Sequence, residues 1–89
     1  MTRKMIKLLD KIDDQLYITN LSVTVIDPIG IGVATFAARS PIRTVENTVH
    51  LIWNGDATAD NLKVIIENDQ DEYGELWRTI HSCIEEVLV

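Results

Sequence analysis

The two histidines and the single cysteine are the side chains best suited to acid–base or nucleophilic chemistry in this sequence. A nucleophile–base pair requires a thiol or hydroxyl beside an imidazole. His81 and Cys83 are two residues apart in a segment of helical periodicity, and residues two apart point to different faces of a helix. We therefore expect Cys83 to be a small packing residue and His81 to face solvent. His50 falls on the polar face of a predicted strand, where the sequence holds no carboxylate or cysteine near it. The sequence predicts no catalytic site.

The acidic residues between positions 67 and 75 superficially suggest a calcium loop. Regular alternating oxygen ligands and a central glycine, both needed by an EF-hand loop, are absent from the segment. Asp69 and Glu72 are instead spaced like a capping box at the start of a helix, where carboxylates accept hydrogen bonds from first-turn amides. Gly30-Ile31-Gly32 lacks the third glycine of a dinucleotide-binding fingerprint, so we assign it to a hairpin. The sequence predicts no metal and no cofactor.

Charge is distributed unevenly along the chain, whose formal net charge is −6. Residues 1–55 have a net charge of +1, whereas residues 56–89 have a net charge of −7. Nucleic-acid binding requires clustered lysine and arginine, so this distribution disfavours a nucleic-acid partner. An acidic half is complementary to a basic surface on another protein, although acidity can also serve solubility alone.

The compartment is predicted from the cysteine count and from the hydropathy pattern. One cysteine cannot form an intramolecular disulfide, which small secreted domains usually need. The basic start of the chain resembles a signal peptide, but Asp10, Lys11, Asp13 and Asp14 interrupt its apolar residues. No stretch approaches the roughly 20 apolar residues of a membrane helix. We expect a cytoplasmic protein, or one acting in a host cytoplasm, without a membrane partner.

Hydrophobic periodicity predicts two helices and four strands. Apolar residues at spacings of three and four predict helices over residues 3–14 and 70–88, and alternation predicts strands over residues 17–26, 31–38, 45–53 and 62–67. A short helix from Thr58 is the competing interpretation for the last strand. Short connections favour a meander with both helices on one face of the sheet. The predicted fold class is a single α+β domain, residues 1–89, of order α-β-β-β-β-α.

The same patterns predict which side chains are buried. In the first strand the expected buried residues are Leu21, Val23 and Val25, and in the third they are Val45, Val49, Leu51 and Trp53. The final helix is expected to bury a stripe that includes Trp77 and to contain Gly74 in its interior. Gly30 is expected to adopt the left-handed conformation that closes a hairpin. Either tryptophan, if partly exposed, would instead be an interface anchor.

Composition and charge favour a non-enzymatic protein–protein interaction module that binds a basic surface on a larger protein. In size and charge it is similar to phage-encoded inhibitors of host defence or nucleic-acid-handling proteins. The alternatives are a small acidic dimeric chaperone for secretion or assembly, and an unrecognised small enzyme; homodimerisation stays open. The predicted partner-binding residues are Asp56, Asp60, Glu67, Asp69, Asp71, Glu72, Glu75 and Trp77.

Overall fold

A computed structural model describes residues 3–26, 30–41, 45–54, 58–67 and 74–89. The elements follow the predicted order, with one additional short 3₁₀ helix. They are α1 (Arg3–Gln15), β1 (Tyr17–Val25), β2 (Gly32–Arg39), β3 (Asn47–Trp53), η1 (Ala59–Asn61), β4 (Lys63–Glu67) and α2 (Glu75–Leu88). The α+β fold class is therefore confirmed.

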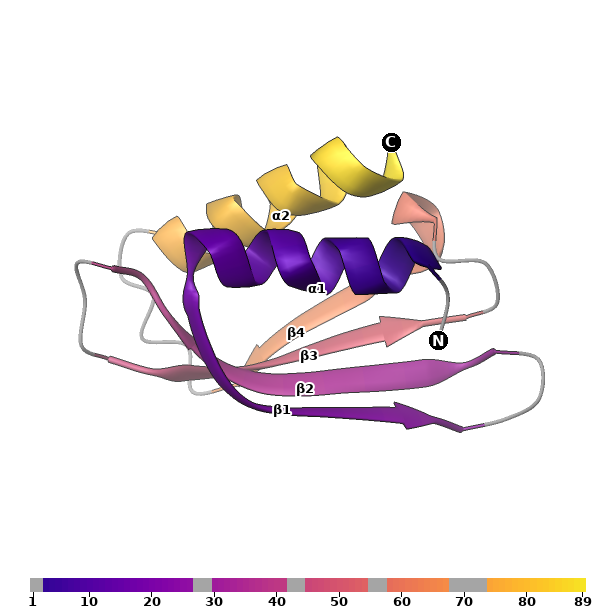
Figure 1. Cartoon of the computed structure of the whole chain (residues 1–89), viewed down its shortest axis with the longest axis horizontal. Coiled ribbons are helices and arrows are strands. Elements are labelled where there is room, and N and C mark those ends of the chain that lie inside the picture. Colours follow the sequence, from indigo (N-terminus) through magenta and orange to yellow (C-terminus); the bar gives the residue numbers. More distant parts are fainter. Residues whose placement is uncertain (1–2, 27–29, 42–44, 55–57, 68–73) are drawn as a thin grey trace.

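The four strands form one antiparallel sheet in the order β1-β2-β3-β4. Both helices lie side by side on the same face of this sheet, and no described helix covers the opposite face, which we call the uncovered face (Figure 1). The meander is confirmed, and β1 and β4 are its two edge strands. The ion pair between Lys11 Nζ and Glu86 Oε2, 3.0 Å apart, joins the two helices at their outer surface. The hydrogen bond to Glu86 and its negative charge raise the pKa of Lys11.

The hydrophobic core lies between the helices and the sheet. The predicted stripe of α1 is buried in full, because its members recur on one side of the helix. Central strands contribute alternate residues, since successive side chains of a strand point to opposite faces. The buried apolar residues are Met5, Leu8, Leu9, Ile12, Leu16, Ala34, Phe36, Ala38, Val49, Leu51, Trp53, Leu76, Ile80, Cys83 and Ile84.

Gly32 and Trp53 lie directly opposite each other on β2 and β3. The indole of Trp53 packs over the Gly32 backbone so closely that an added Cβ at position 32 would lie 2.6 Å from Trp53 Cε2. Gly32, Ala34 and Ala38 lie on the helix-covered face of β2, and Ala37 lies on the opposite face. Gly32 provides space for the largest side chain of the core.

Several predicted burials are wrong for reasons of position in the sheet. Leu21, Val23 and Val25 are exposed, because β1 is an edge strand that has a neighbour on one side only. Val45 is exposed because β3 begins two residues later, at Asn47. The uncovered face carries Ile52 and Ile65, because each alternates with neighbours that lie on the helix-covered face.

The second helix begins later than predicted. Gly74 is its N-cap with φ 69°, not an interior residue, so the left-handed conformation there suits glycine. The proposed capping pair of Asp69 and Glu72 lies outside the described residues. Gly30 has φ 95°, as predicted for a hairpin glycine. The two interpretations of residues 58–67 are both partly correct: Thr58 caps a single 3₁₀ turn, and β4 follows.

Cys83 is buried on the inner side of α2, as predicted for a packing residue. Burial raises the pKa of its thiol, and the charge of Glu86 raises it further. The thiolate is the reactive form. We therefore expect native Cys83 to react with a disulfide reagent at least about 100-fold more slowly than the urea-unfolded chain, because reaction requires opening of the core. Labelling kinetics followed by absorbance measure this ratio, and equal rates in the two states would contradict the buried position.

No helix within the described residues has the length and apolar character required to cross a membrane.

Candidate functional site

The predicted acidic site is only partly within the described residues. Asp56, Asp69, Asp71 and Glu72 lie outside them. Asp60 is exposed in η1, and Glu67 is exposed at the end of β4. Glu75 is the first residue of α2, where its carboxylate lies at the positive end of the helix dipole. Among the predicted acids that can be placed, Glu67 and Glu75 therefore flank the connection from β4 to α2.

Trp77 is the largest departure from the predicted core. Trp77 is 48% exposed and is the third residue of α2, within its first turn. The indole contacts the ring of His81, with ring centroids 4.0 Å apart and an interplanar angle of 50°. That contact makes His81 partly buried, which corrects the prediction that it faces solvent. At 100° per residue, Trp77 and His81 lie on the flank of α2 away from Glu86 and therefore away from α1.

His50 has two polar neighbours that the sequence did not place beside it. Its Nδ1 is 2.9 Å from the Thr35 hydroxyl on β2, and its Nε2 is 3.2 Å from Glu67 Oε1 on β4. The second contact has ion-pair distance when the imidazole is protonated, but it lacks hydrogen-bond geometry, because His50 Nε2 has no hydrogen-bond partner. The three residues lie across three strands on the uncovered face of the sheet.

Hydroxyl, imidazole and carboxylate in that order are the groups of a hydrolytic triad. This arrangement nevertheless has a simpler explanation, since Thr35 and His50 are directly opposite each other in the register of β2 and β3. Facing polar residues on neighbouring strands form such pairs routinely. Alternation within each strand predicts which residues lie on its polar face. The register that brings Thr35 and Glu67 to His50 depends on the pairing of three strands, so no single strand predicts it.

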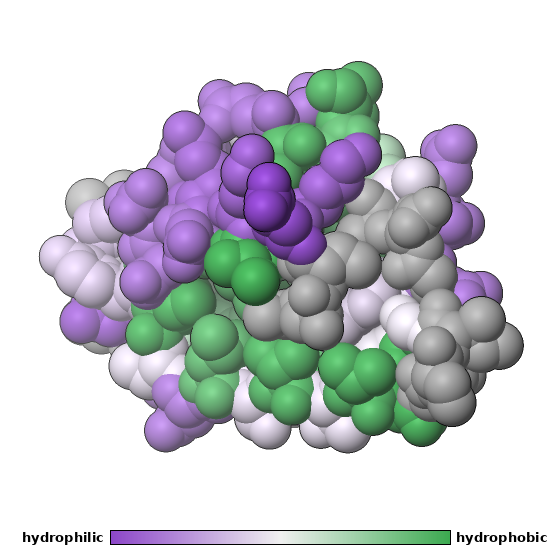
Figure 2. Space-filling model, turned by 45° about the vertical axis from the view of Figure 1, so that its right-hand side comes forward, coloured by the Kyte–Doolittle hydropathy of each residue, from purple (hydrophilic) through white to green (hydrophobic). Residues whose placement is uncertain are grey.

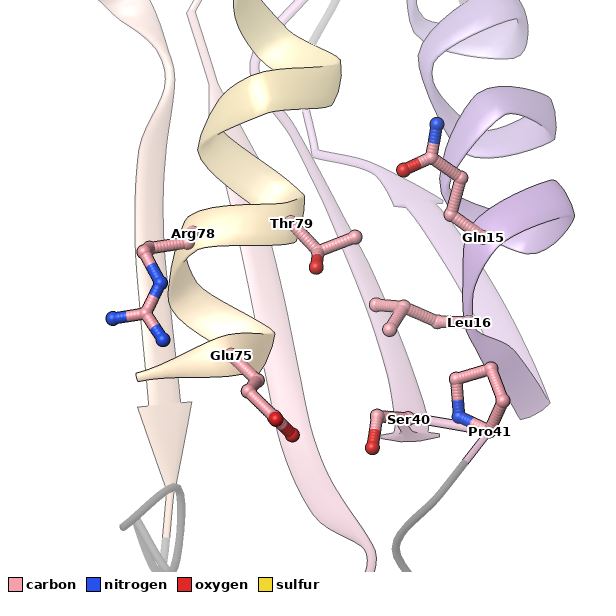
Figure 3. Close-up of a pocket in the computed structure, with 7 residues that line it drawn as sticks. All are labelled: Gln15, Leu16, Ser40, Pro41, Glu75, Arg78 and Thr79. Carbon is pink, nitrogen blue, oxygen red and sulfur yellow. The ribbon is translucent and has the colours of Figure 1, made fainter. Parts of the chain in front are cut away.

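A cavity of about 350 Å³ opens at one end of the helix layer. Its walls come from the end of α1, the residues after β2 and the first turns of α2 (Figure 3). The hydroxyl of Ser40 is buried there and has no hydrogen-bond partner among the described residues, and the side chain of Glu75 points into the same space (Figure 3). The lining residues are Gln15, Leu16, Ser40, Pro41, Glu75, Arg78 and Thr79. The Thr35–His50–Glu67 group does not line this cavity.

Metal ligation and similarity to known proteins add no further site. Within residues 3–26, 30–41, 45–54, 58–67 and 74–89, no group of three or more histidine, cysteine or acidic side chains is placed to hold a metal ion. Comparisons of the chain with protein-family models, with curated proteins and with solved structures find no match.

Proposed function

We propose that this protein is a non-enzymatic interaction module that binds a basic surface on a larger protein. The binding surface consists of the acidic segment over residues 56–75 together with the exposed flank of α2. An inhibitor or adaptor of this kind requires only a stable domain with a complementary surface. The excess of acidic side chains in residues 56–89 supports a basic partner.

The observation that carries the proposal is the exposure of Trp77. Tryptophan is among the residues most enriched at binding hot spots, because its large apolar ring gains much from being covered. The other tryptophan, Trp53, is fully buried, whereas Trp77 is exposed in the first turn of α2, two residues after Glu75. An apolar anchor with acidic neighbours matches the usual plan of an interface, in which a buried centre is surrounded by a polar rim.

Replacing Trp77 with alanine is expected to weaken partner binding at least about 30-fold, which corresponds to a hot spot of about 2 kcal/mol. The partner is first captured from host lysate on the tagged chain at low salt and identified by mass spectrometry. Its affinity for the purified wild-type and variant chains is then measured by calorimetry. Tyr17→Ala is the matched control, because Tyr17 is also an exposed aromatic residue but lies on β1.

Salt dependence tests the electrostatic part of the proposal. Reversing Glu67 and Glu75 to lysine is expected to weaken binding and to reduce its sensitivity to salt, since screening acts on charges that contribute to attraction. Reversing Asp10, an exposed acid on α1 and therefore outside the proposed surface, is the control. Affinity unchanged by Trp77→Ala and by both reversals would contradict the proposed surface.

An enzyme is the rival class, and the Thr35–His50–Glu67 group is the observation in its favour. The two proposals predict different effects of His50→Ala. Partner binding anchored by Trp77 should fall far less with His50→Ala than with Trp77→Ala, because His50 lies on the uncovered face of the sheet and its contact with the proposed surface is through Glu67. A hydrolytic activity that His50→Ala and Thr35→Ala both abolish would instead establish the enzyme.

A further inference from the structure

The free edge of β1 presents an apolar strip that we define as Leu21, Val23, Val25 and Ile26. All four side chains are exposed. Figure 2 shows apolar side chains in a row along the lower edge of the molecule, where β1 lies in Figure 1. Exposed apolar side chains on an unpaired strand mark a site of association with another chain.

Alternate residues along this strip direct their backbone N–H and C=O groups away from β2. The N–H of Ile26 donates to the carbonyl of Ile31, 2.7 Å away, which directs the backbone of Ile26 toward the chain leading into β2. In an antiparallel pair, hydrogen-bonded and non-hydrogen-bonded positions alternate. The N–H and C=O groups of Val25 and Val23 therefore point outward, where a further strand can pair with them.

The opposite edge of the sheet is different. β4 has five residues and carries Lys63 and Glu67, whereas β1 has nine residues and no charged side chain. Natural sheet edges are usually protected from pairing by short length, charge or proline. The first proline after β1 is Pro28, beyond the strip. β4 thus has two of these protections. β1 has a bulge, a further protection, where its register against β2 shifts between Thr19 and Ser22, and it has no such protection over residues 23–26.

We propose that the β1 edge pairs with the β1 edge of a second copy of this chain, forming a two-fold symmetric dimer with a continuous eight-stranded sheet. This proposal uses a different surface from the proposed function and does not rest on it. A dimer is also what the alternative function, an assembly chaperone, requires.

The sequence of the strip is complementary to itself when two copies pair antiparallel about Val23. Leu21 then lies opposite Val25 of the second copy, and Val23 lies opposite its own equivalent, all on the helix-covered side of the sheet. On the other side, Ser22 lies opposite Thr24. Apolar residues therefore meet apolar residues, and hydroxyls meet hydroxyls, which are favourable cross-strand pairs. Outward-pointing backbone groups would form about four to six inter-strand hydrogen bonds.

The absence of charged side chains along β1 allows a second copy to approach at this edge. Two chains of net charge −6 repel each other over most of their surfaces, and residues 17–26 are a segment where no like charges meet. The flank of α1 above the strip extends the contact. Lys11 faces α2, and Ile6 is about 140° around the helix from Lys11, so Ile6 is directed toward β1 and is exposed there.

An interface of one strand and one helix flank is small, below about 1,200 Å², so a weak dimer is expected. Sedimentation velocity on the full chain from about 1 µM to about 1 mM should show a monomer–dimer equilibrium with a dissociation constant in the micromolar range. Val23→Lys should weaken dimerisation at least about 10-fold, because a charge at the seam meets its own copy. Ile65→Lys is the matched control, since Ile65 on β4 is 37% exposed and Val23 is 36% exposed.

Hydrogen exchange on the wild-type chain keeps the test valid if the Val23→Lys variant fails to fold. The amide of Val23 should exchange more slowly as concentration rises, whereas the amide of Thr24, directed toward β2, should be protected at every concentration. A monomer at about 1 mM, a dimer weakened equally by both lysine variants, or Val23 exchange independent of concentration would each overturn the proposal. Binding of a strand from another protein by a chain that stays monomeric would overturn it as well.

Discussion

Trp53→Ala is expected to lower the free energy of unfolding by about 3–5 kcal/mol, the range observed for truncation of a buried tryptophan or phenylalanine. Trp53 is 1% exposed and is the largest fully buried side chain in the described core. A domain of this size has a total stability of about 4–13 kcal/mol. The variant should therefore be marginally folded or unfolded at 37 °C, because the cavity removes contacts from both the sheet and the helix layer.

Urea unfolding followed by circular dichroism measures this loss. Trp53→Phe is the conservative control. It should lower the free energy of unfolding clearly less than Trp53→Ala does, since a phenyl ring still fills most of the space. Trp77→Ala provides a second control, as it removes the same side chain from an exposed position and should change stability by about 1 kcal/mol or less. Equal losses at positions 53 and 77 would contradict the assignment of one tryptophan to the core and the other to the surface.

Gly32→Ala is expected to destabilise the protein by about 1–3 kcal/mol, although it adds only a methyl group. The new Cβ would overlap the indole of Trp53, whose rigid ring has no alternative space inside the core. Elsewhere in a strand the same change would be neutral or stabilising, because glycine loses more backbone entropy on folding than alanine does.

A double-mutant cycle shows whether the clash with the Trp53 indole causes the loss of stability in Gly32→Ala. In a Trp53→Leu background, Gly32→Ala should lower the free energy of unfolding by less than about 0.5 kcal/mol, because the ring that the methyl group would contact is absent. The difference between the two backgrounds is the coupling energy of the pair, measured by urea unfolding of all four proteins. A cost of Gly32→Ala that is the same in both backgrounds would show that backbone conformation, and not the indole, determines it.

Local patterns were sufficient for the elements and for much of the core. The stripe of Met5, Leu8 and Ile12 required only helical spacing, and alternation was sufficient to place Val49, Leu51 and Trp53 on one face of their strand. These patterns are reliable because the periods of a helix and a strand are set by backbone geometry within a few residues. Short connections then allowed the meander and the single helical layer to be predicted.

The candidate sites depended on what lies across the sheet from each residue. Alternation placed His50 on the polar face, but the register of three strands decided that Thr35 and Glu67 are its neighbours. The cavity beside Glu75 likewise needed the end of α1 and the residues after β2 to meet α2. Such contacts join residues far apart in the chain, so no periodicity within one segment reveals them.

The sequence by itself determined the order of the two α-helices and four strands, the buried stripe of α1 and the acidity of residues 56–89. Only the tertiary structure decided that Val23 is exposed and Val49 is buried, although both alternate with polar neighbours in the same way. The physical reason is that alternation records which face of a strand is apolar, whereas burial depends on a second strand and a helix covering that face. β3 lies between two strands and beneath the helices, and β1 lies at the edge, so the same pattern forms a core in one and an exposed strip in the other.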